Sequence, residues 1–340
     1  MMATACLLAK NWKLSNAFKS PLRQFHSSTS LNLNRFLFDP SEIDTEEKSS
    51  SPTITLPKND YRTIHAAKIL SLHNGDTLRA GIVKDANINN STLRPSLVAE
   101  ESEYAGLITD EASIEWIPEG KIKKAQPTKN GDPPGSLQIT LNDLVPIEEE
   151  LSDMKPRVSL ILALPRPLAL GRLLPMIAQM GVDHLVLTAA EKVPKDYFGS
   201  HLFRKPIEIR RALIEGLCQA ADVQIPTVTI TKRLKPFIED DLESMFPSDK
   251  YARVIAHPQR KDGKPSLRMS QISFPENVSG KDKRIVLAVG PEGGWSEPYE
   301  LDLFQEHGFQ QVTLGSRILR SDVAVISLLS LASDLCASDE

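Results

Sequence analysis

The sequence predicts an α/β protein in which a parallel sheet covered by helices follows a smaller β-rich domain. From residue 158 onward, short apolar runs alternate with amphipathic stretches, as in parallel sheets whose crossover connections are helices. Before residue 150, short runs of alternating polarity are separated by turn residues, as in antiparallel sheets. A length of 340 residues suits two domains, which we place at residues 34–150 and 151–340.

The first 33 residues have the composition of an organelle transit peptide. Residues 1–38 contain no Asp or Glu, but they carry Lys10, Lys13, Lys19, Arg23 and Arg35. A targeting segment of this kind does not belong to the fold. The run from Arg23 to Ser28 is typical of a mitochondrial processing site, which favours the mitochondrial matrix over a plastid. A disordered basic tail is the alternative.

Composition argues against several classes of protein. No stretch reaches the roughly 18 to 20 apolar residues of a membrane helix. Three cysteines, with Cys6 inside the transit peptide, are too few for a disulfide framework. Histidines and cysteines lack zinc-ligand spacing, so no metal is expected. Residues 34–150 hold 12 Lys+Arg against 20 Asp+Glu, so any RNA-binding surface there must be a local basic patch.

The first domain is expected to contain short strands and one helix. A helix is predicted from Asp60 to Leu70, with Ile64, Ala67 and Ile69 on its buried face. A loop at 119–136 and an acidic linker at 148–156 follow. The expected strands are Thr53–Leu56, one inside Gly75–Val83 after a turn, Ser96–Glu100, Ile114–Ile117 and Leu137–Leu141.

The second domain is expected to alternate strands and helices. The predicted strands are Val158–Leu164, His184–Leu187, Arg253–His257, Arg284–Val289 and Gln311–Leu314. The predicted helices are Leu168–Met180, a long basic helix over Leu202–Asp222, one that opens at Ser296, and Ala324–Ala337.

Two glycine-bearing turns, at 290–295 and 315–322, follow two of these strands. They therefore lie at the carboxyl ends of strands, where open parallel sheets bind their ligands. Glycine tolerates positive φ and close approach of a ligand to the main chain. Neither turn has the pattern of a P-loop or of a dinucleotide-binding fold. For the first turn, a tight strand-to-helix connection is the alternative.

The two turns together read Gly-Pro-Glu-Gly-Gly-Trp at 290–295 and Leu-Gly-Ser-Arg-Ile-Leu-Arg-Ser-Asp-Val-Ala at 314–324. This pair resembles the ribosomal RNA uridine-N3 methyltransferases of the RsmE family, in the SPOUT superfamily. The resemblance implies a C-terminal trefoil-knot domain after a PUA-like β-barrel, a homodimer, S-adenosylmethionine and a substrate in small-subunit ribosomal RNA. It implies that the cofactor-binding residues are Leu162, Ala163, Val289, Gly290, Glu292, Gly293, Gly294, Leu314, Gly315, Ile318, Leu319 and Arg320.

Arg320 and Asp322 are the candidate catalytic residues. Uracil N3 is protonated at neutral pH, so a cation beside the uracil carbonyl oxygens would stabilise the anion, and a carboxylate or water would accept the proton. The family usually carries Thr-Glu where this chain has Ser321 and Asp322. A purely structural role as a helix N-cap is the alternative for Asp322, and a favourable position in the first turn of a helix is the alternative for Glu292.

Cations on two predicted helices are candidate RNA contacts, with a solvated helix face as the alternative. They are Arg62, His65 and Lys68 in the first domain and Arg204, Arg210 and Arg211 in the second. Met176, Gln179 and Asp222 replace residues that the family carries near its substrate groove, which leaves the RNA target open. The alternative functions are a catalytically weak RNA-binding ribosome assembly factor and a SPOUT methyltransferase that acts on transfer RNA.

Overall fold

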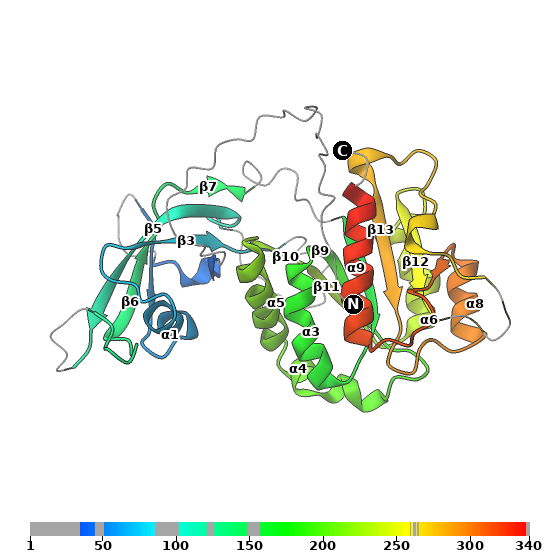
Figure 1. Ribbon diagram of the computed structural model, residues 1–340, viewed down its shortest axis with the longest axis horizontal. Coiled ribbons are helices and arrows are strands. Elements are labelled where there is room, and N and C mark those ends of the chain that lie inside the picture. Colours follow the sequence, from blue (N-terminus) through cyan, green and yellow to red (C-terminus); the bar gives the residue numbers. More distant parts are fainter. Residues whose placement is uncertain are drawn as a thin grey trace, which may run out of the picture. The chain divides into compact units, whose positions relative to one another are not determined.

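The computed structural model contains one mainly antiparallel sheet, one six-stranded parallel sheet and a small two-stranded parallel sheet (Figure 1). It describes residues 35–44, 51–85, 102–120, 126–147, 157–258, 260, 263 and 265–337. The predicted strand at Ser96–Glu100 lies outside these residues. No helix among them is long and apolar enough to cross a membrane.

The first sheet has the strand order β1-β3-β5-β6-β2, with β7 paired to β5. β1 runs parallel to β3 and the other pairs are antiparallel. Inward side chains such as Ile54, Ile114 and Trp116 form its core. The elements of this part are β1 (Phe36–Phe38), η1 (Pro40–Glu42), β2 (Thr53–Leu56), α1 (Tyr61–Lys68), β3 (Thr77–Ile82), β4 (Lys84–Asp85), β5 (Leu107–Pro118), β6 (Gly135–Thr140) and β7 (Val145–Pro146).

Helix α1 confirms the predicted helix but not its predicted buried face. Thr63, Ala66 and Ala67 are buried, whereas Ile64 and Ile69 are 40% and 67% exposed. The buried residues are small and lie three or four positions apart, so this face of α1 can pack closely against the sheet. Each residue along a helix turns by about 100°, so Ile64, one position after Thr63, points away from that face.

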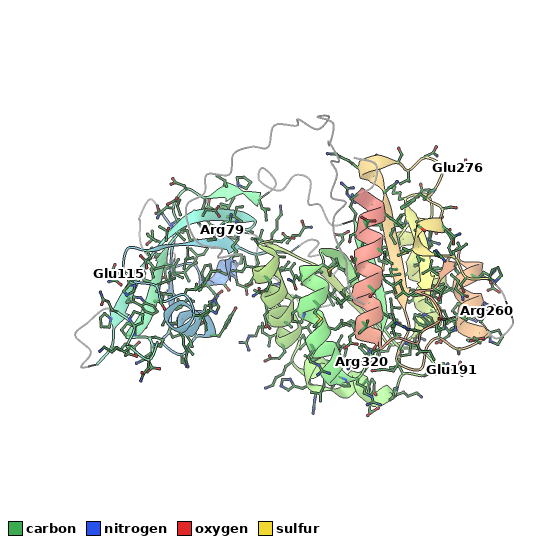
Figure 2. The ribbon with its side chains drawn as sticks, in the orientation of Figure 1. Arg79, Glu115, Glu191, Arg260, Glu276 and Arg320 are labelled. Carbon is green, nitrogen blue, oxygen red and sulfur yellow. The ribbon has the colours of Figure 1, made fainter. Side chains whose placement is uncertain are left out.

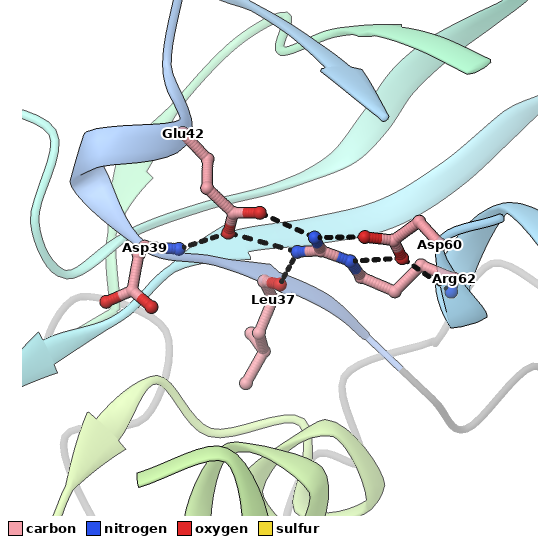
Figure 3. Close-up of polar contacts among 5 residues, drawn as sticks. All are labelled: Leu37, Asp39, Glu42, Asp60 and Arg62. Atoms are coloured by element: carbon pink, nitrogen blue, oxygen red, sulfur yellow. Dashed lines mark hydrogen bonds and ion pairs between the residues drawn. The ribbon is translucent and has the colours of Figure 1, made fainter. Parts of the chain in front are cut away.

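Arg62, in the first turn of α1, fixes the rotation of that helix (Figure 3). Its Nη1 donates to the carbonyl of Leu37 at 3.0 Å, and its Nη2 donates to Glu42 at 2.5 Å and to Asp60 at 2.9 Å. The Asp60 carboxylate also accepts the backbone N–H of Arg62 at 2.8 Å, which caps the helix. One guanidinium therefore joins α1 to β1 and to the turn that follows β1.

The second sheet has the strand order β11-β9-β8-β13-β12-β14, and all of its pairs are parallel. This confirms the predicted α/β class. The elements of this part are β8 (Val158–Ala163), α3 (Pro167–Gln179), β9 (Val182–Thr188), η4 (Lys195–Gly199), α4 (His201–Arg204), α5 (Ile207–Ala220), β10 (Gln224–Ile225), β11 (Thr227–Thr231), α6 (Leu234–Pro236), η5 (Phe237–Asp241), α7 (Leu242–Met245), β12 (Tyr251–Ala256), η6 (Met269–Gln271), η7 (Gly280–Asp282), β13 (Arg284–Val289), α8 (Tyr299–Glu306), β14 (Gln310–Val312) and α9 (Ser321–Ala337).

Two predicted helices in this part were wrong in extent, and proline explains both. The predicted helix over Leu202–Asp222 is two helices, α4 and α5, interrupted at Pro206. The helix expected from Ser296 begins instead at Tyr299, directly after Pro298. Proline lacks an N–H and keeps the residue before it out of helical geometry, so each helix starts just beyond its proline.

The two sheets are joined by short polar and backbone contacts. β4 pairs with β10 as a two-stranded parallel sheet, and the N–H of Arg35 donates to the carbonyl of Cys218 at 3.0 Å. The buried Arg210 of α5 donates to Asp39 at 2.6 Å. These contacts hold α5 against the segment that follows β1.

Helices α3 and α5 lie side by side (Figure 1) and meet through Gly216. A Cβ at Gly216 would stand 2.0 Å from the carbonyl oxygen of Pro175 in α3, inside contact distance. Gly171, also in α3, has no atom nearer than 4.0 Å to its added Cβ. The close packing of the two helices therefore requires glycine only at position 216.

We expect Gly216→Ala to lower the free energy of unfolding by about 2 kcal/mol, because the added methyl group forces the helices apart. Gly171→Ala is the matched control. It should be neutral or stabilising by up to about 1 kcal/mol, since alanine favours helix and has room there. Urea unfolding of both variants measures the difference. Equal stability of the two variants would contradict this packing.

Candidate active site

A pocket of about 120 Å³ opens at the carboxyl ends of β12, β13 and β14, beside the start of α9. Carboxyl ends of strands in a parallel sheet are the usual ligand position. Its walls are mostly apolar side chains and exposed main chain, as in sites for small organic ligands. The lining residues are Ala256, His257, Pro258, Val289, Gly290, Pro291, Glu292, Gly294, Val312, Thr313, Leu314, Gly315, Arg317, Ile318, Leu319, Ser321, Ala324 and Leu328.

Both glycine turns predicted from the sequence line this pocket. In the first, Gly294 has φ +66° and donates its N–H to Pro291 O at 2.8 Å, which closes a tight turn. A Cβ at Gly290 would lie 3.1 Å from the backbone nitrogen of Trp295, so a larger residue there would make a tight contact where the turn folds back. In the second, Gly315 has φ +110°. These three glycines give the turns their shape.

The end of β12 supplies a third wall of the pocket. Leu162 and Ala163, expected to contact the cofactor, are fully buried at the end of β8 and do not line the pocket. Because β12 lies between β13 and β14, its own end supplies the wall instead, through Ala256, His257 and Pro258. A histidine directly after a buried strand was the sequence signal for this wall, and it was missed.

Three buried polar atoms around the first turn have no hydrogen-bond partner among the described residues. They are Nδ1 of His257, Nε1 of Trp295 and Oγ of Ser296. The other ring nitrogen of His257 lies 3.1 Å from Glu297 Oε1, which holds the ring in place. Of these three residues only His257 lines the pocket, so its imidazole adds a polar group to the mostly apolar wall. The site therefore fits a ligand with both apolar and hydrogen-bonding groups.

Glu292 binds a neighbouring loop rather than its own helix. Its Oε1 accepts the N–H of Arg166 at 3.0 Å, at the N-terminus of α3. A carboxylate is favourable there because of the helix dipole. Glu292 also lines the pocket, so it ties the pocket wall to the loop that follows β8.

Arg320 lies at the start of α9 (Figure 2) and forms an ion pair with Asp322. Arg320 is 73% exposed and stands between Leu319 and Ser321, which both line the pocket. Asp322 is the second residue of α9, not its N-cap, and it accepts the N–H of Val323 at 2.9 Å. The hydrogen bond from Arg320 lowers the pKa of Asp322 below its usual value. The ion pair holds the Arg320 guanidinium beside the Asp322 carboxylate.

The remaining predicted cofactor residues divide into two groups. Val289, Gly290, Glu292, Gly294, Leu314, Gly315, Ile318 and Leu319 line the pocket. Gly293 and Arg320 lie in the same turns without lining it. No three His, Cys, Asp or Glu side chains among the described residues come together in a way that would hold a metal ion.

The six candidate RNA contacts do not form one surface. Arg62 and Arg210 are engaged inside the protein by carboxylates, which argues against both as phosphate contacts. His65 is half-buried beside Phe36, with 6.0 Å between ring centroids. Lys68 and Arg204 are exposed, and Arg211 is exposed beside Glu208 at 3.3 Å. Spacing on a helix does not reveal which cations already have an internal partner.

Two residues that hold the first turn were missed by sequence reasoning. Lys192, after β9, donates to Gly293 O at 2.8 Å and to Trp295 O at 3.2 Å. Glu300, buried in α8, accepts the N–H groups of Glu191 and Ser296 at 2.7 Å each. No sequence motif marks either residue, because both act across segments about 100 residues apart.

The chain is an α/β protein with a pocket at the carboxyl ends of its parallel strands, and comparison with known proteins identifies its class as a methyltransferase. Residues 153–333 match the RNA methyltransferase domain family, and the chain belongs to that family. The prediction of an RsmE-type protein is confirmed by relatives that are named ribosomal RNA small subunit methyltransferase E.

The similarity to individual relatives is low and covers them unevenly. The protein of that name from Treponema pallidum is 26% identical over 166 residues, which are 48% of this chain and 57% of that protein. The match therefore spans little more than half of the Treponema protein. The methyltransferase E 1 of Borreliella burgdorferi is 20% identical over 79% of this chain and 88% of that protein.

Two solved structures share the fold over nearly their whole length. The ribosomal RNA small subunit methyltransferase E of Neisseria gonorrhoeae, bound to S-adenosylmethionine, has a TM-score of 0.56 at 17% identity and covers 90% of this chain and 99% of its own. A methyltransferase from Legionella pneumophila, also with bound S-adenosylmethionine, has a TM-score of 0.54 at 18% identity and covers 88% and 98%.

Proposed function

We propose that the protein methylates N3 of a uridine in small-subunit ribosomal RNA and uses S-adenosylmethionine as methyl donor. One observation carries the proposal. In a chain of the RNA methyltransferase domain family, the two glycine turns line a single pocket at the carboxyl ends of parallel strands. The pocket's apolar walls suit an adenine ring, and the main chain of Gly290, Gly294 and Gly315 suits its polar edges.

S-adenosylmethionine supplies a methyl group activated by a positively charged sulfur. The protein must align that group with the nucleophile and make the nucleophile available. Arg320 suits the second task, since its exposed guanidinium stands at the pocket rim, where a uracil outside the pocket can be reached. There it would stabilise negative charge on the uracil oxygens. Asp322 orients Arg320, which leaves water as the proton acceptor.

Exposed cations on α3, α4 and the segment before α4 are the proposed RNA surface. Leu202 of α4 lies 4.0 Å from a Cβ added at Gly171, which places α4 against the start of α3. The exposed cations on these neighbouring elements are Arg166, Arg172, Lys195, Arg204 and Lys205. Such a patch binds phosphates regardless of the overall negative charge of the chain.

We propose further that the chain works as a homodimer, with a trefoil knot and a PUA-like N-terminal barrel, in the mitochondrial matrix. Large apolar side chains near α9 and on α3 support the dimer. Leu168, Met176, Ile318 and Val323 are 85%, 44%, 88% and 48% exposed. An exposed apolar patch of this kind marks a contact with another protein surface. The composition of residues 1–33 supports the location, with a plastid as the alternative.

Transfer of tritium from labelled S-adenosylmethionine to RNA tests the proposal. Small ribosomal subunits from cells that lack the protein should accept label, and subunits from wild-type cells should accept little, because their uridine is already methylated. Label on transfer RNA instead would show a methyltransferase with a different substrate. Absence of label on either RNA, with cofactor bound, would identify an assembly factor without catalysis.

A further inference from the structure

We propose that Lys192 is a positioning residue that, together with Glu300, holds the first glycine turn in the shape that binds the methyl donor. This inference rests on the proposed function of the pocket. Lys192 and Glu191 belong to the loop after β9, a segment about 100 residues before the turn. Neither Lys192 nor Glu300 lines the pocket.

Lys192 and Glu300 bind the main chain of Gly293, Trp295 and Ser296. Lys192 donates to the carbonyls of Gly293 and Trp295, at 2.8 Å and 3.2 Å. Glu300 accepts the N–H of Ser296 at 2.7 Å. These three residues of the turn do not line the pocket, whereas Gly290, Glu292 and Gly294 do. The main chain that faces the ligand is therefore left available while its neighbours are fixed.

Glu300 also connects the two loops to each other. Its second oxygen accepts the N–H of Glu191 at 2.7 Å, so one buried carboxylate holds both the loop that carries Lys192 and the turn. Hydrogen bonds to charged groups are stronger than neutral ones, and a carboxylate buried with two donors is held firmly. The stem of Lys192 packs over Gly293, where a Cβ would lie 3.0 Å from Cδ of the lysine.

Fixing this turn matters because glycine-rich main chain is otherwise free to move. A flexible turn must lose conformational freedom when it binds a ligand, which weakens binding. The hydrogen bonds made by Lys192 and Glu300 remove that freedom before the ligand binds. Their loss should therefore lower affinity for the donor, while the rate of the saturated enzyme, set by groups elsewhere, stays nearly constant.

Lys192→Met is the test, because Lys192 is exposed and its loss leaves the core intact. We expect the Kd and KM for S-adenosylmethionine to rise about tenfold, with kcat within twofold of wild type. Lys192→Arg should restore most of the affinity, since arginine also donates to both carbonyls. Lys250→Met, an exposed lysine before β12, is the matched control and should match wild type.

Hydrogen exchange supplies a readout that needs no ligand. In Lys192→Met the amides of Gly294 and Ser296 should exchange faster than in wild type, with an unchanged Tm. Unchanged affinity and exchange in Lys192→Met would overturn the inference, as would an equal fall in kcat, affinity and Tm. If wild type itself fails to bind S-adenosylmethionine, the proposed function is wrong, and exchange alone still decides whether Lys192 orders the turn.

Discussion

Replacing Arg320 with lysine is expected to slow methyl transfer by about 10² to 10³-fold while affinity for S-adenosylmethionine stays at the wild-type value. Arg320 is exposed at the rim of the pocket without lining it, so the donor keeps its contacts. Lysine cannot reproduce the planar, multi-donor contact that a guanidinium makes with the carbonyl oxygens of uracil. Single-turnover rates and donor titrations on the same preparation measure the two effects separately.

Asp322→Asn is the companion variant. Asparagine keeps an acceptor for the N–H of Val323, but it loses the charge that orients Arg320. We expect a smaller loss of rate than in Arg320→Lys and no change in Tm. A fall in Tm and donor affinity together in Arg320→Lys, with normal turnover of the folded fraction, would show that Arg320 only supports the fold. Near-full activity in both variants would mean that neither residue takes part in the chemistry.

Replacing Arg62 with methionine is expected to lower the free energy of unfolding by about 3 kcal/mol. The guanidinium, only 11% exposed, would be lost, and the carboxylates of Glu42 and Asp60 would be left together without a cation (Figure 3). Arg211→Met is the control, since its ion pair with Glu208 is solvated and should contribute less than about 0.5 kcal/mol. Urea unfolding monitored by circular dichroism compares them, and equal losses would contradict a structural role for Arg62.

The same ion pairs predict how stability depends on pH. Burial alone would raise the pKa of Asp60, but hydrogen bonds and charge from Arg62 outweigh it, so the folded-state pKa lies below 3.8. The unfolded chain then binds a proton more readily, so the contribution of Asp60 is present above about pH 4 and is lost as pH falls through the folded-state pKa. The stability difference between wild type and Arg62→Met should therefore shrink below pH 4. A difference that stays constant down to pH 2 would show that Asp60 does not supply it.

The sequence predicted five of the six strands of the parallel sheet, most clearly β8 and β13, which are largely apolar runs. It missed β11, which reads Thr-Val-Thr-Ile-Thr. The predicted helix boundaries were less accurate where a single proline changes the position at which a helix begins. Pro206 divides a predicted helix, and Pro298 delays another. The face of α1 was wrong because small Ala66 and Ala67 pack inward while larger Ile64 stays outside.

The candidate site was predictable where the residues are close in sequence. The main chain of Gly290, Gly294 and Gly315 comes from two short motifs, and both line the pocket. Lys192 and Glu300 were not predictable from any motif, since their contacts join segments about 100 residues apart. His257 could have been recognised, because it directly follows a buried strand. The ion pairs of Arg62 and Arg210 were hidden for the same reason, so both residues looked like free cations in the sequence.

The proposed reaction is the transfer of a methyl group to N3 of a uridine in small-subunit ribosomal RNA. Mapping of 3-methyluridine by mass spectrometry, in organellar small-subunit RNA from cells with and without the protein, tests it most directly. We predict one 3-methyluridine that is present in wild-type cells and absent from cells that lack the protein. It should return when the wild-type gene is expressed in those cells. At an early time after induction, it should not return when the Arg320→Lys variant is expressed instead. The same 3-methyluridine content in both kinds of cell would contradict the claim.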